Sequence, residues 1–130
     1  MKNHTLLSGI GLVAYCGFIF FLSSLPSSSI GTLPFSDKTI HFFLYLGFGS
    51  TFFYFLKNLK SDLSLIAVVI ITFSFSLIYG LSDEIHQLFV PGRTFDLKDL
   101  LADTIGGTCG GLLILFLYEL KRSTTKILTK

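Results

Sequence analysis

The chain has 130 residues, of which 51% are hydrophobic and 14% are charged, and its mean hydropathy is +0.72. This composition excludes a single water-exposed globule and is typical of a membrane protein. The formal net charge of only +2 provides no basic surface for nucleic acid, and we expect no such partner. We interpret residues 1–130 as one domain. Cys16 and Cys109 have no metal-ligand or redox spacing, so we expect both to be small buried apolar residues.

The first predicted membrane-spanning helix covers about residues 6–25. Its apolar run is longer than a usual signal-peptide core and no Ala-x-Ala cleavage site follows, so we expect a retained helix. Gly9, Gly11 and Gly17 are expected to let a neighbouring helix approach closely. A serine-rich stretch with two prolines follows over about residues 23–34, and it predicts a polar loop longer than a simple helical hairpin needs.

The second predicted span covers about residues 38–56, and we expect Asp37 to cap its N-terminus. At 100° per residue, four polar residues of its first turns fall within about 100° of arc on one helix face. They are Asp37, Lys38, His41 and Tyr45. This helix therefore presents a polar stripe at one end only.

The third predicted span covers about residues 63–88, and its last turns carry a dense group of polar side chains. Four of them fall within about 100° of arc and a fifth lies on the flank. The four are Tyr79, Asp83, His86 and Gln87, and the fifth is Glu84. Hydrocarbon would leave such a face without hydrogen-bond partners, so we expect it to face other helices or a wet cavity.

A turn is predicted directly after this helix, because Pro91 and Gly92 are natural central residues of a type II turn. The turn places Arg93 beside the polar helix end. Arg93 either holds the turn together or binds a phosphate or a carboxylate, and the sequence leaves both roles open.

The fourth predicted span covers about residues 97–119 and opens at Asp96. An arc of about 80° holds three acids and two glycines, which are Asp96, Asp99, Asp103, Gly107 and Gly110. Gly106 with Gly110, and Gly107 with Gly111, have the small-xxx-small spacing that lets another backbone approach. We therefore expect Asp103 to be the least hydrated of the three acids, with His41, Lys38 or Arg93 as its partner.

Basic residues predict the orientation of the four spans. Seven lie on the side of the two termini and of the turn near residue 60, against three on the other side. By the positive-inside rule both termini are cytoplasmic, and the polar helix ends lie at the outer face. Six carboxylates gather there, and we expect them to be paired with bases, protonated, or gathered around a cation.

The polar residues also carry a resemblance. Ser23-Ser24-x-Pro26, Asp37-Lys38-x-x-His41-Phe42-x-x-Tyr45, Asp83-Glu84-x-His86-Gln87-x-Phe89-x-Pro91-Gly92-Arg93-x-x-Asp96-x-x-Asp99 and Gly107 resemble the VanZ-like family. The resemblance implies a small multi-pass protein of the bacterial inner membrane. The founding member of that family is associated with resistance to the lipid-tailed glycopeptide teicoplanin. One position departs from the family pattern, since Asp103 stands where Asn is usual.

Three functional classes remain open. The first is a membrane-embedded hydrolase or transferase that acts on a lipid-linked phosphate or glycan, with acid and base groups from His41, Asp83, Glu84 and His86. The second is a module that binds or shields a head group, or an antibiotic, without chemistry. The third is an ion or proton pathway, which ranks last because the polar stripes stop at one leaflet.

We expect the cavity to bind the anionic head group of a membrane lipid or lipid-linked cell-envelope precursor. The residues expected to contact it are Asp37, Lys38, Tyr45, Tyr79, Gln87, Arg93, Asp96, Asp99 and Asp103. A divalent metal held by His41, Asp83 and His86 is a further alternative. No tight ligand motif such as His-Glu-x-x-His supports it.

Overall fold

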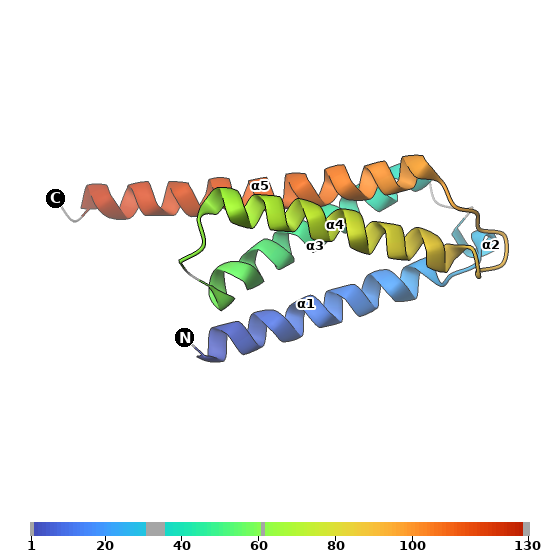
Figure 1. Cartoon of the computed structure of the whole chain (residues 1–130), viewed down its shortest axis with the longest axis horizontal. Helices are drawn as coiled ribbons and strands as arrows, with labels where there is room; N and C mark the ends of the chain where they lie inside the picture. Colours follow the sequence, from blue (N-terminus) through green and yellow to red (C-terminus); the bar gives the residue numbers. More distant parts are fainter. Residues whose placement is uncertain (1, 31–35, 61, 129–130) are drawn as a thin grey trace.

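The computed structural model describes residues 2–30, 36–60 and 62–128, so part of the loop expected over residues 23–34 lies outside the described residues. The order of elements is α1 (Lys2–Ser23), α2 (Ser27–Ile30), α3 (Asp37–Leu59), α4 (Leu65–Gln87) and α5 (Leu97–Leu128) (Figure 1). The two termini and the α3–α4 connection lie at one end of the bundle, and the α4–α5 connection lies at the other.

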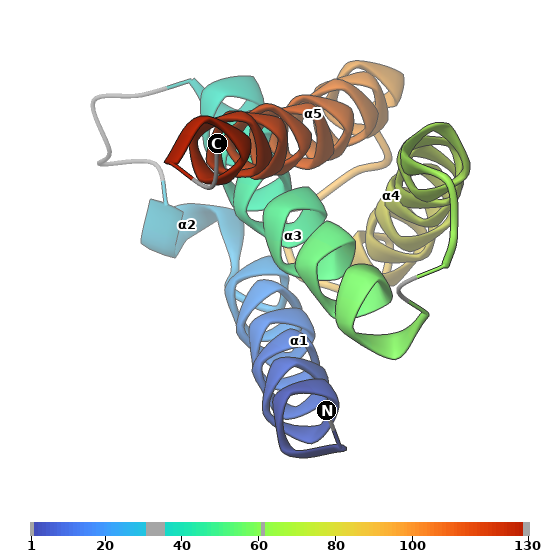
Figure 2. The same cartoon turned by 90° about the vertical axis from the view of Figure 1, so that its left-hand side faces the viewer.

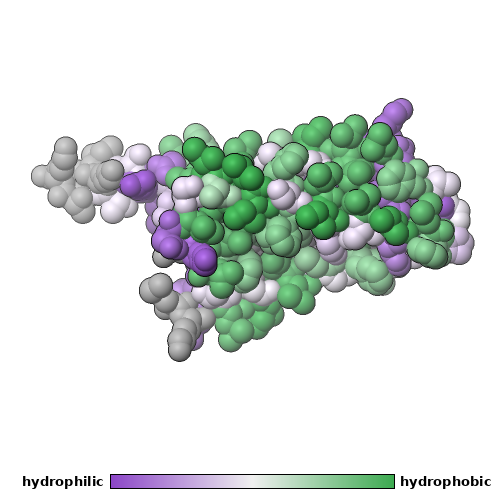
Figure 3. Space-filling view, in the orientation of Figure 1, coloured by the Kyte–Doolittle hydropathy of each residue, from purple (hydrophilic) through white to green (hydrophobic). Residues whose placement is uncertain are grey.

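Four of these helices are long and apolar enough to cross a membrane, which confirms the predicted all-α fold with four spans. The candidate spans are Asn3–Ser23, Asp37–Leu59, Leu65–Gln87 and Leu97–Thr125. Apolar atoms cover the middle of the molecule, and hydrophilic side chains gather toward its two ends (Figure 3). This pattern is the one expected of a bundle that faces hydrocarbon around its waist.

Two helix boundaries differ from the prediction. The cap of α3 is Ser36, whose hydroxyl accepts the Thr39 backbone N–H at 3.3 Å, so the prediction of Asp37 as the cap is wrong. Asp37 is instead the first helical residue, and its carboxylate is free to pair with a base outside the helix. The last helix continues to Leu128, well past the predicted end, since the residues that follow the apolar run include no glycine or proline to stop it.

Helix α3 lies at the centre of the bundle, with α1, α4 and α5 around it (Figure 2). Its closest neighbour is α5, because glycines remove the side chains between them. A methyl group at Gly106 would meet the Phe42 carbonyl, and one at Gly110 would meet the Leu46 carbonyl. The predicted small-xxx-small packing of the last helix is therefore confirmed.

Helix α1 packs differently from the other three. A Cβ added at Gly11 or Gly17 would meet nothing within 4 Å, so the prediction of close helix approach at these two glycines is wrong. Hydroxyl groups tie the helix to its neighbours instead: Tyr15 donates to the Leu44 carbonyl at 3.0 Å and Tyr79 to the Cys16 carbonyl at 2.8 Å. Most large side chains of α1 are exposed and would face lipid.

The apolar core runs along α3, and four of its largest members are Tyr45, Phe48, Phe52 and Phe53. Neither cysteine belongs to its fully buried part. Cys16 is half-buried against this core and Cys109 is exposed on α5, so the expectation that both are buried is wrong. Hydropathy alone does not separate a residue that faces lipid from one that faces protein.

Candidate functional site

The site lies at the end of the bundle where α3 begins, α4 ends and α5 begins. The turn between α4 and α5 has the predicted type II form: Gly92 has a φ of 76°, and the Arg93 N–H donates to the Val90 carbonyl at 3.1 Å. Only glycine adopts this φ without strain, and the resulting bend returns the chain over the helix ends.

Ion pairs connect the start of α3 to the turn and to α5. Arg93 Nη1 lies 2.9 Å from Asp37 Oδ2, and the Arg93 side chain is only 9% exposed. Lys38 Nζ lies 2.8 Å from Asp96 Oδ2 and 3.1 Å from Asp99 Oδ1. Two bases at this end are therefore paired with three acids, of which Asp99 is buried.

Asp96 and Glu84 order the first turn of α5. The Asp96 side chain accepts the Lys98 N–H at 2.8 Å, while its own backbone N–H donates to Glu84 Oε2 at 2.8 Å. The hydrogen bond from Lys38, followed by that from Lys98, holds the pKa of Asp96 below its usual value. Glu84 is fully buried, and its role in this structure is to anchor the α4–α5 connection.

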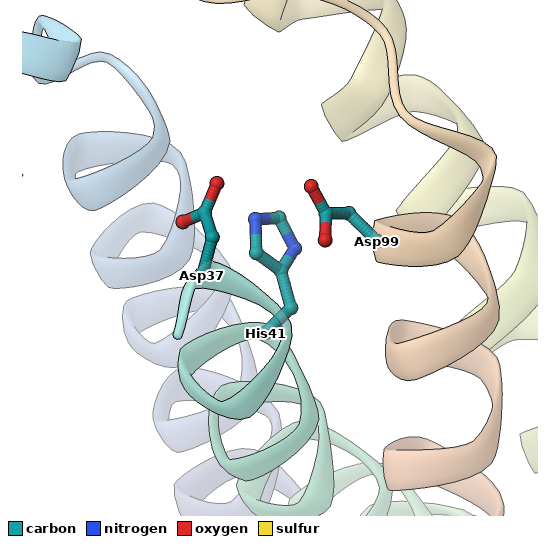
Figure 4. A group of neighbouring side chains, drawn as sticks. All are labelled: Asp37, His41 and Asp99. Atoms are coloured by element: carbon teal, nitrogen blue, oxygen red, sulfur yellow. The ribbon is translucent and has the colours of Figure 1, made fainter. Parts of the chain in front are cut away.

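Deeper in the bundle, His41 of α3 pairs with Asp103 of α5. His41 Nδ1 lies 2.9 Å from Asp103 Oδ1, and the two residues are 5% and 0% exposed. The prediction that Asp103 is the least hydrated acid of α5 and pairs with His41 is confirmed. Figure 4 shows the His41 ring between the carboxylates of Asp37 and Asp99, so acids from two helices approach one imidazole.

A cavity of about 190 Å³ lies beside this pair. It is lined by the polar residues Ser23, Asp37, His41, Asp83, Gln87 and Arg93 and by the apolar residues Ile19, Leu22, Leu25, Ile40 and Leu44. Tyr45 lines it as well and is fully buried. The Gln87 amide donates to Asp83 Oδ2 at 3.4 Å. The cavity thus joins charged groups to an aliphatic surface supplied by α1 and α3.

Several predicted site residues do not line this cavity. His86 turns toward α1, where its Nε2 lies 3.0 Å from the Ser24 hydroxyl and its ring centroid lies 4.4 Å from that of Phe20. Tyr79 donates its hydroxyl hydrogen to the carbonyl of Cys16, and Glu84 bonds to the Asp96 backbone. Lys38, Asp96, Asp99 and Asp103 surround the cavity without lining it.

The predicted site residues included neither Ser23, although it belongs to the Ser23-Ser24-x-Pro26 motif, nor the aliphatic residues that line the cavity. Ser23 is 5% exposed at the end of α1, and it lies at the same membrane level as His41 and Asp83. The signal in the sequence was the position of Ser23, a polar residue at the end of a long apolar run. Two other predicted helices also have polar residues at the corresponding end. Nothing in the sequence marks Ile19 or Leu22 as cavity residues, because the same residue types face lipid elsewhere on α1.

Two groups of side chains at this end have the spacing of metal ligands. One consists of Asp37, His41 and Asp99, and the other of His41, Asp83 and Asp103, with ligand atoms all within 4.8 Å of one another in each group. His41 belongs to both. In the predicted ligand set of His41, Asp83 and His86, the structure has Asp103 in the place of His86.

Comparison with known proteins gives one family and one relative. A family model described as VanZ/LLP1 matches residues 10–118. An uncharacterized protein of Schizosaccharomyces pombe, C11E3.10, is 30% identical over 127 residues, which cover 98% of this chain and 71% of that protein. No solved structure matches this chain.

Proposed function

This chain belongs to the VanZ/LLP1 family, and we propose that it binds the anionic head group of a lipid-linked molecule in the cavity between α1, α3 and α4. The observation that carries the proposal is a cavity at one end of a membrane-spanning bundle that is lined by both charged and aliphatic side chains. The charged and polar groups suit a phosphate or glycan head group, and the aliphatic side chains suit the first carbons of a lipid tail.

Arg93 is the group that we assign to the anion. It lines the cavity, its side chain is largely buried, and its Nε has no hydrogen-bond partner among the described residues. A planar guanidinium with an unused donor favours bidentate binding of phosphate oxygens. Its Nη1 is held by Asp37, which fixes the direction of the remaining donors.

A larger hollow of about 610 Å³ lies between α3 and α5 at the opposite end. It is lined by Tyr54, Ile114, Leu117, Tyr118, Lys121, Arg122 and Thr125, several of which are exposed to the surroundings of the bundle. Its lining has no histidine or carboxylate and no buried arginine comparable to Arg93, so we assign the function to the smaller cavity.

We propose that the site faces the outer leaflet and that both termini are cytoplasmic. Seven basic residues lie on the side of the termini, which supports this orientation under the positive-inside rule. The bacterial inner membrane is the location that the motif resemblance implies. A relative in a yeast indicates that the family also extends to eukaryotic cells.

Hydrolysis or transfer of the bound head group is a second candidate function, and the observation that favours it is the presence of His41 and Asp83 in the same cavity. Asp103 orients the His41 ring, so the other ring nitrogen is available to take a proton from an attacking water or hydroxyl. We assign Glu84 and His86 to support of the helix ends. A proton pathway has less support, because the ionisable groups gather at one end.

The test of head-group binding uses purified protein in detergent and a polyprenyl phosphate of short chain length. Arg93→Ala is expected to weaken binding about 10-fold to 100-fold, because a hydrogen bond to a charged group contributes roughly 1.5 to 3 kcal/mol. Asp37→Asn is the matched variant, since it disrupts the same ion pair and leaves the guanidinium in place. It is expected to lose clearly less affinity than Arg93→Ala, because the guanidinium charge remains although Asp37 no longer fixes its direction.

Equal losses in the Arg93 and Asp37 variants would mean that the ion pair only shapes the turn, and the head-group assignment would then be wrong. Arg122→Ala, at the far end of α5, checks for a general effect of positive charge and is expected to change nothing. Release of phosphate from a polyprenyl diphosphate, lost in His41→Ala, would establish turnover in addition to binding.

A further inference from the structure

We propose that His41, Asp83 and Asp103 form a binding site for one divalent cation of the oxygen-preferring kind, for which Mn²⁺ is the probe. The three residues come from α3, α4 and α5, so the cation would join the three helices at the inner wall of the cavity. The site lies in the same cavity as the proposed head-group site, but its cation binding does not depend on any lipid.

The geometry fits a single ion. One ring nitrogen and one oxygen from each carboxylate lie within 4.8 Å of one another. Cation–oxygen bonds of about 2.0 to 2.6 Å place ligands on opposite sides of an ion about 4 to 5 Å apart, so small rotamer changes are enough to close the site. All three residues are buried, which fixes their side chains by packing.

The charge balance at this end also favours a cation here. Arg93 pairs with Asp37, and the single charge of Lys38 is shared between Asp96 and Asp99. Asp83 and Asp103 form no salt bridge with lysine or arginine in the described part of the chain, and the base near them is His41. Two buried carboxylates with so little compensation are unfavourable in a membrane-spanning bundle unless a cation or protons neutralise them.

Two oxygen atoms without partners also point to a ligand, and one of them, the Tyr45 hydroxyl, is independent of the acid cluster. Asp103 Oδ2 and the Tyr45 hydroxyl have no hydrogen-bond partner among the described residues, and both residues are 0% exposed. Buried polar atoms without partners are rare in folded proteins. Tyr45 lines the cavity together with His41 and Asp83, and Asp103 contacts His41 on one side and lies beside Gly80 of α4 on the other. A cation with its bound water would give both atoms a partner.

The donor set indicates which ion fits. One imidazole and two carboxylates suit Mn²⁺ and related divalent cations, whereas soft ions prefer thiolates. The alternative group of Asp37, His41 and Asp99 shares the imidazole, but its acids are already paired with Arg93 and Lys38. A cation at His41, Asp83 and Asp103 would also offset the negative charge of the carboxylates at the cavity and let an anionic head group approach Arg93.

The experiment measures Mn²⁺ binding to purified, chelator-treated protein in detergent without added lipid, by electron paramagnetic resonance of free Mn²⁺. We expect one saturable site per chain. Asp103→Asn and Asp83→Asn should each weaken it about 10-fold or more, while His86→Gln and Asp99→Asn should leave it within about 2-fold. If Asp103→Asn does not fold, as judged by gel filtration and circular dichroism, Asp83→Asn decides the test.

Absence of saturable binding in the wild type would overturn the proposal, as would a loss confined to Asp99→Asn and Asp37→Asn. Lipid binding measured with Mn²⁺ and with chelator separates this inference from the proposed function. Mn²⁺ binding without lipid binding leaves the cation site intact and removes the head-group function. Lipid binding in the presence of chelator, by a protein that does not bind Mn²⁺, supports the head-group function and removes the cation site.

Discussion

His41 Nδ1 and Asp103 Oδ1 lie 2.9 Å apart across the interface of α3 and α5, and both residues are shielded from solvent. Replacing Asp103 by Leu would leave the imidazole without this partner, which is expected to destabilise the protein by about 1 to 3 kcal/mol. Asp103→Asn keeps a hydrogen-bonding group of the same shape, so it is expected to destabilise the protein less than Asp103→Leu. Thermal unfolding of both variants in one detergent at one pH measures the difference, and a Leu variant as stable as the wild type would contradict it.

The close approach of α5 to α3 predicts that added methyl groups disrupt the bundle. Gly106→Ala and Gly110→Ala place a Cβ against the carbonyls of Phe42 and Leu46, and overpacking of this kind costs about 1 to 3 kcal/mol. Gly11→Ala is the matched control, because its Cβ meets nothing within 4 Å and alanine favours the helix. A lower melting temperature for Gly11→Ala than for Gly106→Ala would contradict the prediction that Gly106 is needed for the close approach of α5 to α3.

Accessibility of introduced cysteines tests the orientation. In a protein whose Cys16 and Cys109 have been replaced by serine, a cysteine at Thr94 should react with an impermeant thiol reagent on intact spheroplasts. A cysteine at Asn58 should react only after lysis, because it lies at the end that carries the termini. Labelling at Asn58 in intact spheroplasts would reverse the topology.

Acid pH should weaken the start of α5. The pKa of Asp96 is lowered by Lys38 and by the Lys98 N–H, so its ionised form is the one that stabilises the fold. This stability is fully present above the unfolded pKa of about 3.9 and is lost as the pH falls through the lower folded pKa. The difference in melting temperature between wild type and Asp96→Asn should therefore be larger at pH 7 than at pH 3. A difference in melting temperature that is larger at pH 3 than at pH 7 would contradict the expected direction of this pH dependence.

Residues whose environment follows from helix spacing were predictable from the sequence. The four spans follow from apolar runs, and the burial of Asp103 follows from the glycines one turn below it. The type II turn follows from Pro91 and Gly92, whose backbone preferences are local. Each of these features depends on a short stretch of chain.

The neighbours of a helix were not predictable in the same way. His86 and Asp83 share a face of α4 in projection, yet His86 reaches α1 while Asp83 reaches the cavity with His41. A helical wheel gives the direction of each side chain and says nothing about which helix lies there. The same limit explains why close helix approach was wrongly predicted at Gly11 and Gly17, since small residues allow close packing only where another helix is present.

Helix α1 is attached to the bundle by the buried Ile19 side chain and by hydroxyl-to-carbonyl hydrogen bonds, and it makes no close backbone contact at Gly11 or Gly17. It nevertheless supplies Ile19, Leu22, Ser23 and Leu25 to the cavity. Segments with few buried contacts open at the lowest free energy. We therefore expect a molecule dissolved in the bilayer to reach His41 and Arg93 sideways past α1, at a rate that depends on how often this helix moves outward while α3, α4 and α5 stay together.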